Sequence, residues 1–146
     1  MNTNSQGPSG EISITRVDGI SAAHRYHSEQ LSEDENRRVF GKCNRPHGHG
    51  HNYRLEVTVS GPVDPVTGMV MNLADLDRIL REVVVEPLDH SFLNHDVAHF
   101  ADVVPTSENI ALWLVDQLAT PLSGLRVRLR SVRLYESDDL YAEVGL

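Results

Sequence analysis

The stretch that decides the fold is His51-Asn-Tyr-Arg-Leu-Glu-Val-Thr-Val-Ser60, in which apolar and polar side chains alternate. The apolar positions are Tyr53, Leu55, Val57 and Val59. Side chains two residues apart point to the same side of a strand. The pattern therefore predicts a strand with one face buried and the other exposed.

Just before this strand, the sequence Cys43-Asn-Arg-Pro-His-Gly-His-Gly-His51 places the only cysteine of the chain beside three alternating histidines. Because alternate residues share a strand face, His49 and His51 can hold one metal ion, and His47 lies on the same face. Catalytic zinc normally has three protein ligands and one open position. His24, at the end of a predicted strand over residues 11–24, is the best candidate for the third ligand. Taken alone, the motif also allows a histidine-rich loop that binds metal without a function.

Helix signals occupy two places further along the chain. Asn72 can cap a helix with an apolar stripe that ends at Pro87, and a second helix follows Thr106. A capping box at Ser32 and Glu35 predicts a further short helical turn that ends near residue 41.

Two more strands are predicted, over residues 125–136 with a bulge near Ser131 and over residues 140–144. The order is then two strands, two helices and two strands. That order predicts an α+β fold with an antiparallel sheet.

Composition indicates one domain over residues 11–146, preceded by a Ser-, Asn- and Gly-rich tail, residues 1–10, that we expect to be disordered. The net charge of −8 and the pI near 5.4 argue against nucleic-acid binding. A single cysteine excludes an intrachain disulfide. No apolar run approaches the roughly 18 residues of a membrane span, and the first ten residues lack a signal-peptide pattern, so we expect a cytoplasmic protein.

Seven motifs taken together resemble the 6-pyruvoyl/6-carboxytetrahydropterin synthase family from about Ile14 to the C-terminus. They are Ser-Ala-Ala-His-Arg, Phe-Gly-Lys-Cys-Asn, Gly-His-Gly-His-Asn-Tyr, the segment 64–76, Pro87-Leu-Asp-His, Thr106-Ser-Glu-Asn and Tyr135-Glu136. The resemblance implies a tunnelling fold, a four-stranded antiparallel sheet with two helices on one face. It also implies that trimers join their sheets into a barrel and that two trimers form a homohexamer.

The activity that the resemblance implies is a zinc-dependent lyase of tetrahydrobiopterin biosynthesis. Its substrate is 7,8-dihydroneopterin triphosphate, and its products are 6-pyruvoyltetrahydropterin and triphosphate. One alternative is the 6-carboxytetrahydropterin synthase of queuosine biosynthesis. An alternative from another class is a non-catalytic metal-binding module.

The resemblance also implies roles for individual residues, in a site that lies between subunits. The implied zinc ligands are His24, His49 and His51. The residues implied in catalysis are Cys43 as the proton-abstracting base, Asp89 and His90 as its helpers, and Glu136 as pterin anchor and proton relay. The residues implied to line the pterin pocket are Thr106 and Ser107.

The spacing inside the motif leaves one ambiguity. Three residues separate Cys43 from His47-Gly48-His49, as in the carboxy enzymes, whereas five separate it from His49-Gly50-His51, as in the pyruvoyl enzymes. We prefer the second register because His51 leads directly into the alternating strand. Three basic residues flank the motif as candidates to meet the triphosphate: Arg25, Lys42 and Arg45.

Overall fold

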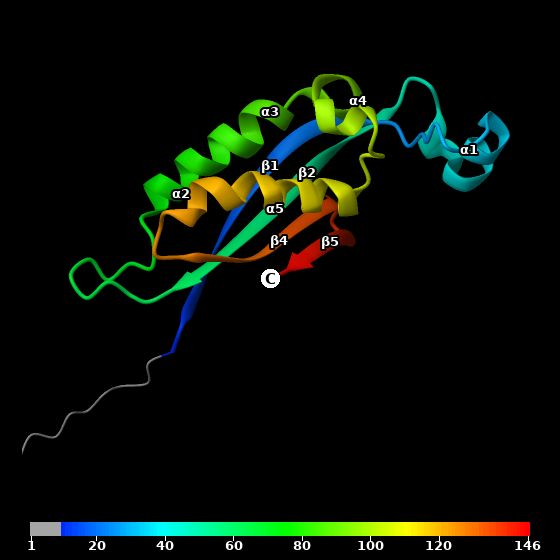
Figure 1. Ribbon diagram of the computed structural model, residues 1–146. Coiled ribbons are helices and arrows are strands. Elements are labelled where there is room, and N and C mark those ends of the chain that lie inside the picture. The colour runs from blue at the N-terminus through cyan, green and yellow to red at the C-terminus, as the bar shows by residue number, and fades with distance from the viewer. Residues whose placement is uncertain (1–9) are drawn as a thin grey trace, which may run out of the picture.

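The computed structural model describes residues 10–146. Residues 1–9, which form nearly all of the tail expected to be disordered, lie outside the described residues. The rest of the chain forms a five-stranded sheet in the order β3-β1-β2-β4-β5, with helices packed on it (Figure 1).

The two long strands of the sheet form its centre. Strands β1 (Ile12–His24) and β2 (His49–Gly61) pair antiparallel over their whole length, so that His24 lies opposite His49. The apolar face predicted for residues 53–59 is buried, which confirms the alternating pattern. Strand β2 begins at His49, two residues earlier than predicted, because its pairing with β1 extends to the last residue of that strand.

Strands β4 (Arg128–Ser137) and β5 (Leu140–Gly145) continue the sheet. Thr58 pairs with Ser131 and Val59 with Leu129, so Arg130 is the extra residue of a bulge, as predicted near Ser131. The strand starts at Arg128, three residues later than expected.

The expectation of a four-stranded, purely antiparallel sheet is wrong. A fifth strand, β3 (Ser91–Phe92), runs parallel to the end of β1 and makes the sheet mixed. The chain is held there by Ser21, whose amide donates to Asp89 Oδ1 (2.8 Å) and whose carbonyl accepts from the His90 amide (2.6 Å). Two residues are too few to produce an alternating pattern in the sequence.

The predicted helix after Asn72 is present, but it is not a regular α-helix throughout. Asn72 caps α2 (Leu73–Leu80), which continues through a π-helical segment, η2 (Arg81–Val85), into α3 (Glu86–Leu88). Pro87 lies one residue before the last residue of α3, Leu88, so the predicted end of the helix is confirmed to within one residue.

The second predicted helix is α5 (Ser107–Ser123), capped by Thr106, whose side chain accepts from the Asn109 amide. Its apolar stripe, formed by Ile110, Ala111, Leu114 and Leu118, is buried. Pro121 lies inside the helix, which ends at Ser123.

Helices α2, α3 and α5 cover one face of the sheet, as predicted, and the core lies between the two layers (Figure 1). The capping box opens α1 (Glu33–Phe40), followed by a 3-10 turn, η1 (Gly41–Asn44); both lie beyond one end of the sheet. The remaining short helices are α4 (Leu93–Asp96) and η3 (Ala98–Ala101). Among residues 10–146, no helix combines the length and apolar character needed to cross a membrane.

Candidate metal centre and active site

Three histidines and one carboxylate meet where three neighbouring strands end. One ligand atom from each of His24, His49, His51 and Glu136 lies within 4.8 Å of the others. His24 ends β1, His49 and His51 begin β2, and Glu136 is near the end of β4. His24 alternates with buried Ala22, His51 with buried Tyr53 and Glu136 with buried Leu134, so the cluster lies on the helix-covered face.

His24 is fully buried and has one ring nitrogen already engaged. Its Nδ1 lies 2.8 Å from the Pro105 carbonyl oxygen, which accepts the ring N–H, and 3.0 Å from the Tyr53 hydroxyl. Its Nε2 then carries the lone pair and lies 3.1 Å from His49 Nε2. Burial lowers the pKa of His24 to about 4, although the Pro105 carbonyl opposes this, so the ring is neutral near pH 7.

His51 and Glu136 form the other half of the cluster. His51 Nε2 is 2.9 Å from Glu136 Oε1, yet the contact lacks hydrogen-bond geometry, and this buried nitrogen has no hydrogen-bond partner among the described residues. Burial lowers the pKa of His51, and the nearby Glu136 carboxylate only partly offsets that effect. The other oxygen of Glu136 accepts from the Ser107 hydroxyl at 2.8 Å.

These groups fit a zinc ion. Two nitrogens held at 2.0–2.1 Å by tetrahedral zinc lie about 3.3 Å apart, close to the 3.1 Å between His24 and His49. A carbonyl that accepts the second ring N–H is the usual device for directing a histidine to a metal. The unpartnered nitrogen of His51 is the polar atom that a cation would satisfy. Nitrogen-rich sets with one carboxylate suit zinc among the common metals.

His47 is not a member of this cluster. It precedes β2 in a turn closed by a bond from the Gly48 amide to the Arg45 carbonyl (2.9 Å). The structure therefore brings together the histidines of the preferred register, with His47 outside.

Cys43 lies in η1, partly buried and outside the metal cluster. Its carbonyl accepts from the Tyr26 amide at 2.9 Å, and the Tyr26 ring packs edge-on at 4.9 Å from the His24 ring. This contact ties the cysteine turn to the metal centre of the same chain.

Asp89 and His90 form a pair outside the metal cluster. Asp89 Oδ2 lies 2.8 Å from His90 Nδ1, and the His90 side chain is 84% exposed. His90 has a left-handed backbone with φ of 59°. It shares a hollow of about 410 Å³ with His51 that Cys43 does not line, and no hydrogen bond or ion pair joins the dyad to Cys43 within the described chain.

Of the two residues expected in the pterin pocket, Ser107 touches Glu136, while the Thr106 hydroxyl caps α5. The sequence reasoning missed Tyr53 and Pro105, which hold His24. The alternation that places His49 and His51 on one face also places Tyr53 there, so a signal for it existed. Pro105 acts through its backbone carbonyl, which leaves no trace in the residue type.

Comparison with known proteins gives one consistent family. The sequence matches the family model described as 6-pyruvoyl tetrahydropterin synthase over residues 13–145. It is 54% identical to 6-pyruvoyl tetrahydrobiopterin synthase of Poecilia reticulata over 125 residues, 86% of this chain and 84% of that protein. It is 48% identical to the Homo sapiens protein of the same name over 140 residues, 95% of this chain and 94% of that one.

A solved structure agrees with these matches. The fold is similar to that of Caenorhabditis elegans 6-pyruvoyl tetrahydropterin synthase, with a TM-score of 0.86 and 39% identity. The similarity covers 93% of this chain and 96% of the other.

Proposed function

Because this chain belongs to the 6-pyruvoyl tetrahydropterin synthase family, we propose how its own residues carry out that reaction. The protein is an enzyme of tetrahydrobiopterin synthesis, a lyase that releases phosphate. We propose that it takes 7,8-dihydroneopterin triphosphate and releases triphosphate as 6-pyruvoyltetrahydropterin forms. The observation that carries this proposal is the cluster of three histidines with Glu136.

In this proposal His24, His49 and His51 hold zinc through their Nε2 atoms. The Pro105 carbonyl keeps the Nδ1 hydrogen of His24 in place, so its Nε2 stays free to bind metal. Bound zinc supplies a Lewis acid that acidifies hydroxyl and C–H groups of the substrate side chain.

Glu136 has two possible positions in such a site. As a fourth ligand it would complete the coordination of the metal, which is typical of a structural zinc. A catalytic zinc instead keeps one coordination position open. We propose that Glu136 faces the pterin, because a carboxylate can accept hydrogen bonds from a ring N–H and an exocyclic amine together. Ser107 orients that carboxylate through its hydroxyl.

Metal analysis of Glu136→Gln separates these two positions. We expect the variant to keep its zinc and lose substrate binding. Loss of zinc would make Glu136 a ligand and would favour the non-catalytic metal-binding module.

We propose that Cys43, Asp89 and His90 carry out the proton transfer. The thiolate of Cys43 accepts a proton from the substrate side chain. Asp89 Oδ2 accepts the Nδ1 hydrogen of His90 at 2.8 Å. The other ring nitrogen of His90, Nε2, is then free to exchange protons with the Cys43 thiol. Because His90 is exposed and no hydrogen bond or ion pair joins the dyad to Cys43 within the described chain, we propose that an adjacent copy supplies the dyad.

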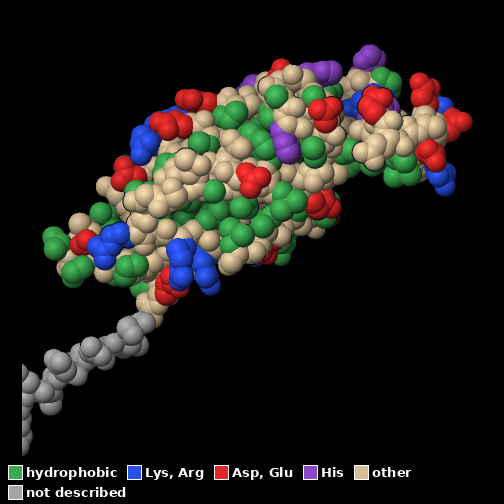
Figure 2. Space-filling view, viewed as in Figure 1, with side chains coloured by type: hydrophobic (Ala, Val, Ile, Leu, Met, Phe, Trp, Pro, Cys, Tyr) green, Lys and Arg blue, Asp and Glu red, His purple; other side chains and the backbone are tan. Residues whose placement is uncertain are grey.

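The sheet has edges suited to such an assembly. Strand β5 is an edge strand with exposed apolar side chains, among them Leu140 and Tyr141, and apolar side chains also gather over α5 and β4 in Figure 2. Unpaired strand edges favour pairing with another chain, and closed symmetric oligomers are the usual result. We propose a tunnelling-fold hexamer built from two trimers, working in the cytoplasm.

The direct test is to incubate the purified protein with 7,8-dihydroneopterin triphosphate and identify the pterin by mass. We expect the 6-pyruvoyl product with inorganic triphosphate. A 6-carboxy product with acetaldehyde would assign the chain to the queuosine branch. Absence of turnover by a zinc-loaded hexamer would overturn the proposal.

A further inference from the structure

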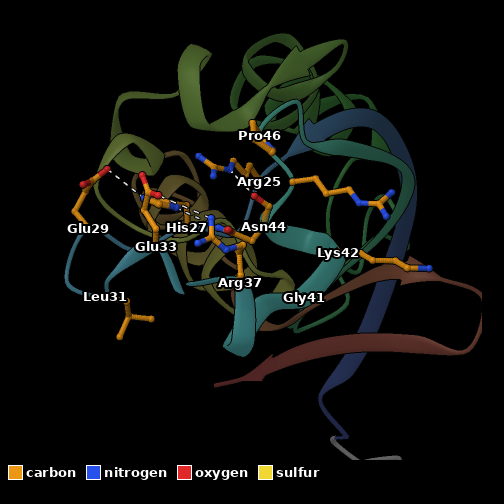
Figure 3. Close-up of a pocket in the computed structure, with 11 residues that line it drawn as sticks. Arg25, His27, Glu29, Leu31, Glu33, Arg37, Gly41, Lys42, Asn44 and Pro46 are labelled. Carbon is orange, nitrogen blue, oxygen red and sulfur yellow. Dashed lines mark hydrogen bonds and ion pairs between the residues drawn. The ribbon is translucent and has the colours of Figure 1, made fainter. Parts of the chain in front are cut away.

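A cleft of about 830 Å³ lies beside the cysteine turn, between the end of β1 and helix α1 (Figure 3). Its basic lining residues are Arg25, Arg37, Lys42 and Arg45. Arg25 directly follows the metal-cluster residue His24, and Lys42 directly precedes Cys43. The cleft is therefore connected by sequence to both parts of the proposed reaction centre.

The four cations of the cleft differ in how they are compensated. Arg37 is paired with Glu33 and with Asp34 on its own helix. Arg25, Lys42 and Arg45 have no carboxylate within ion-pair distance in the part of the chain that the structure describes. Of the two lining carboxylates, Glu33 faces Arg37 and Glu29 lies 3.4 Å from His27.

Three uncompensated cations in one cleft are unexpected in a chain whose net charge is −8. Like charges gathered in a concave site raise the local concentration of ions of opposite sign. The cleft is therefore suited to an anion of several charges.

Arg25 is held in a fixed place by its backbone and by one atom of its side chain. The Asn94 side chain accepts from the Arg25 amide and donates to its carbonyl, at 2.8 and 2.9 Å. Arg25 Nε donates to the Asn44 carbonyl at 2.9 Å, which leaves both terminal amino groups for another acceptor. A guanidinium fixed in this way presents a planar fork that matches phosphate oxygens.

Lys42 and Arg45 come from the turn that carries Cys43. Figure 3 shows Lys42 extending away from the Glu33–Arg37 pair, so it is not drawn into that pair. A lysine ammonium acts as a point charge that tolerates several phosphate positions.

We propose that this cleft is a polyphosphate site, in which Arg25, Lys42 and Arg45 bind the triphosphate group of the substrate and hold it until release. The assignment rests on the proposed function, under which triphosphate is the leaving group. It adds a binding site outside the metal cluster and separates recognition of the phosphate chain from recognition of the pterin by Glu136.

The test is calorimetric titration of the full, zinc-loaded protein with inorganic tripolyphosphate, which requires no turnover. Lys42→Ala and Arg45→Ala should each weaken binding by roughly tenfold, as expected for loss of one charge-assisted contact. Arg38→Ala is the matched control: it removes the same charge from α1, outside the cleft lining, and should leave affinity within about twofold. For Arg25 we use Arg25→Lys in place of an alanine variant, because the Arg25 side chain also bonds the Asn44 carbonyl. Zinc content and melting temperature check that each variant is folded.

Equal binding by wild type, Lys42→Ala and Arg45→Ala would overturn the cleft assignment. So would binding that survives in these variants but disappears in His51→Ala, because the anion would then lie on the metal. If the cleft variants lose tripolyphosphate binding while the wild type makes no pterin product, the polyphosphate site stands and the proposed function falls.

Discussion

The metal cluster and the Asp89–His90 pair have opposite structural settings. His24 is completely buried on a paired strand, whereas the His90 side chain is 84% exposed on a turn. Strand pairing places His24 opposite His49 within one chain, so the metal centre needs no partner. The dyad, by contrast, faces outward, and we propose that it acts with Cys43 of another copy. Metal binding and proton transfer should therefore respond differently to mutation and to assembly.

The largest expected effect is at the metal cluster. His51→Ala removes one of the three proposed zinc ligands, so we expect loss of both zinc and turnover. His47→Ala is the control, since His47 stands outside the cluster, and should retain a full complement of zinc by elemental analysis. Zinc lost from His47→Ala but retained in His51→Ala would mean that the other register holds the metal.

Substitution of the cysteine should separate the two regions. We expect Cys43→Ala to keep zinc and hexameric assembly while turnover falls by about 10²–10⁴-fold, as for loss of a general base. Steady-state kinetics, zinc analysis and light scattering check this. An active Cys43→Ala enzyme would remove Cys43 from the mechanism.

Mixed hexamers test which chain supplies the dyad. If each site takes its metal from one chain and His90 from the next, random mixing of His51→Ala with His90→Ala subunits restores about a quarter of the sites. Mixing His51→Ala with Cys43→Ala restores none, because both residues must come from one chain. Equal recovery in the two mixtures, or a fully active monomer, would contradict the division between subunits.

A smaller effect is expected at Gly48, just before the cluster. Its φ of +67° disfavours other residues, and an added Cβ would lie 2.7 Å from the His24 carbonyl oxygen. Gly48→Ala should therefore lower the free energy of unfolding by about 2–4 kcal/mol and weaken zinc binding.

Gly68 provides the comparison, since it also has a positive φ, +73°, but open space around its Cβ position. Gly68→Ala should cost only about 1–2 kcal/mol and leave zinc affinity unchanged. Equal losses in denaturant titrations of the two variants would show that the contact with His24 does not matter.

The smallest effect concerns pH and the dyad. The Ser21 amide, followed by His90, lowers the pKa of Asp89 below its ordinary value of 3.8. A carboxyl whose folded-state pKa is depressed stabilises the fold above that ordinary value and loses the contribution as pH falls through the folded-state pKa. The stability difference between wild type and Asp89→Asn should thus be constant above about pH 5 and shrink towards pH 3. A difference that grows on acidification, in denaturant midpoints, would reverse the sign of this linkage.

Local pattern determined a large part of this protein. Alternation predicted β2, and capping residues predicted the starts of α1, α2 and α5. A switch in which alternate positions are apolar predicted a bulge near Ser131, and the structure has it at Arg130. These signals are visible because each depends on residues close together in the chain. The spacing of His49 and His51 belongs to the same class.

Tertiary structure alone decided the rest. Strand β3 exists because the Ser21 backbone bonds both the Asp89 carboxylate and the His90 amide, and the helix after Asn72 reaches Leu88 through a π-helical segment that no sequence pattern indicated. The engagement of His24 by the Pro105 carbonyl joins groups 81 residues apart through a backbone atom common to every residue type. Side-chain type and spacing carry information about local geometry, whereas backbone contacts between distant segments depend on how the whole chain packs.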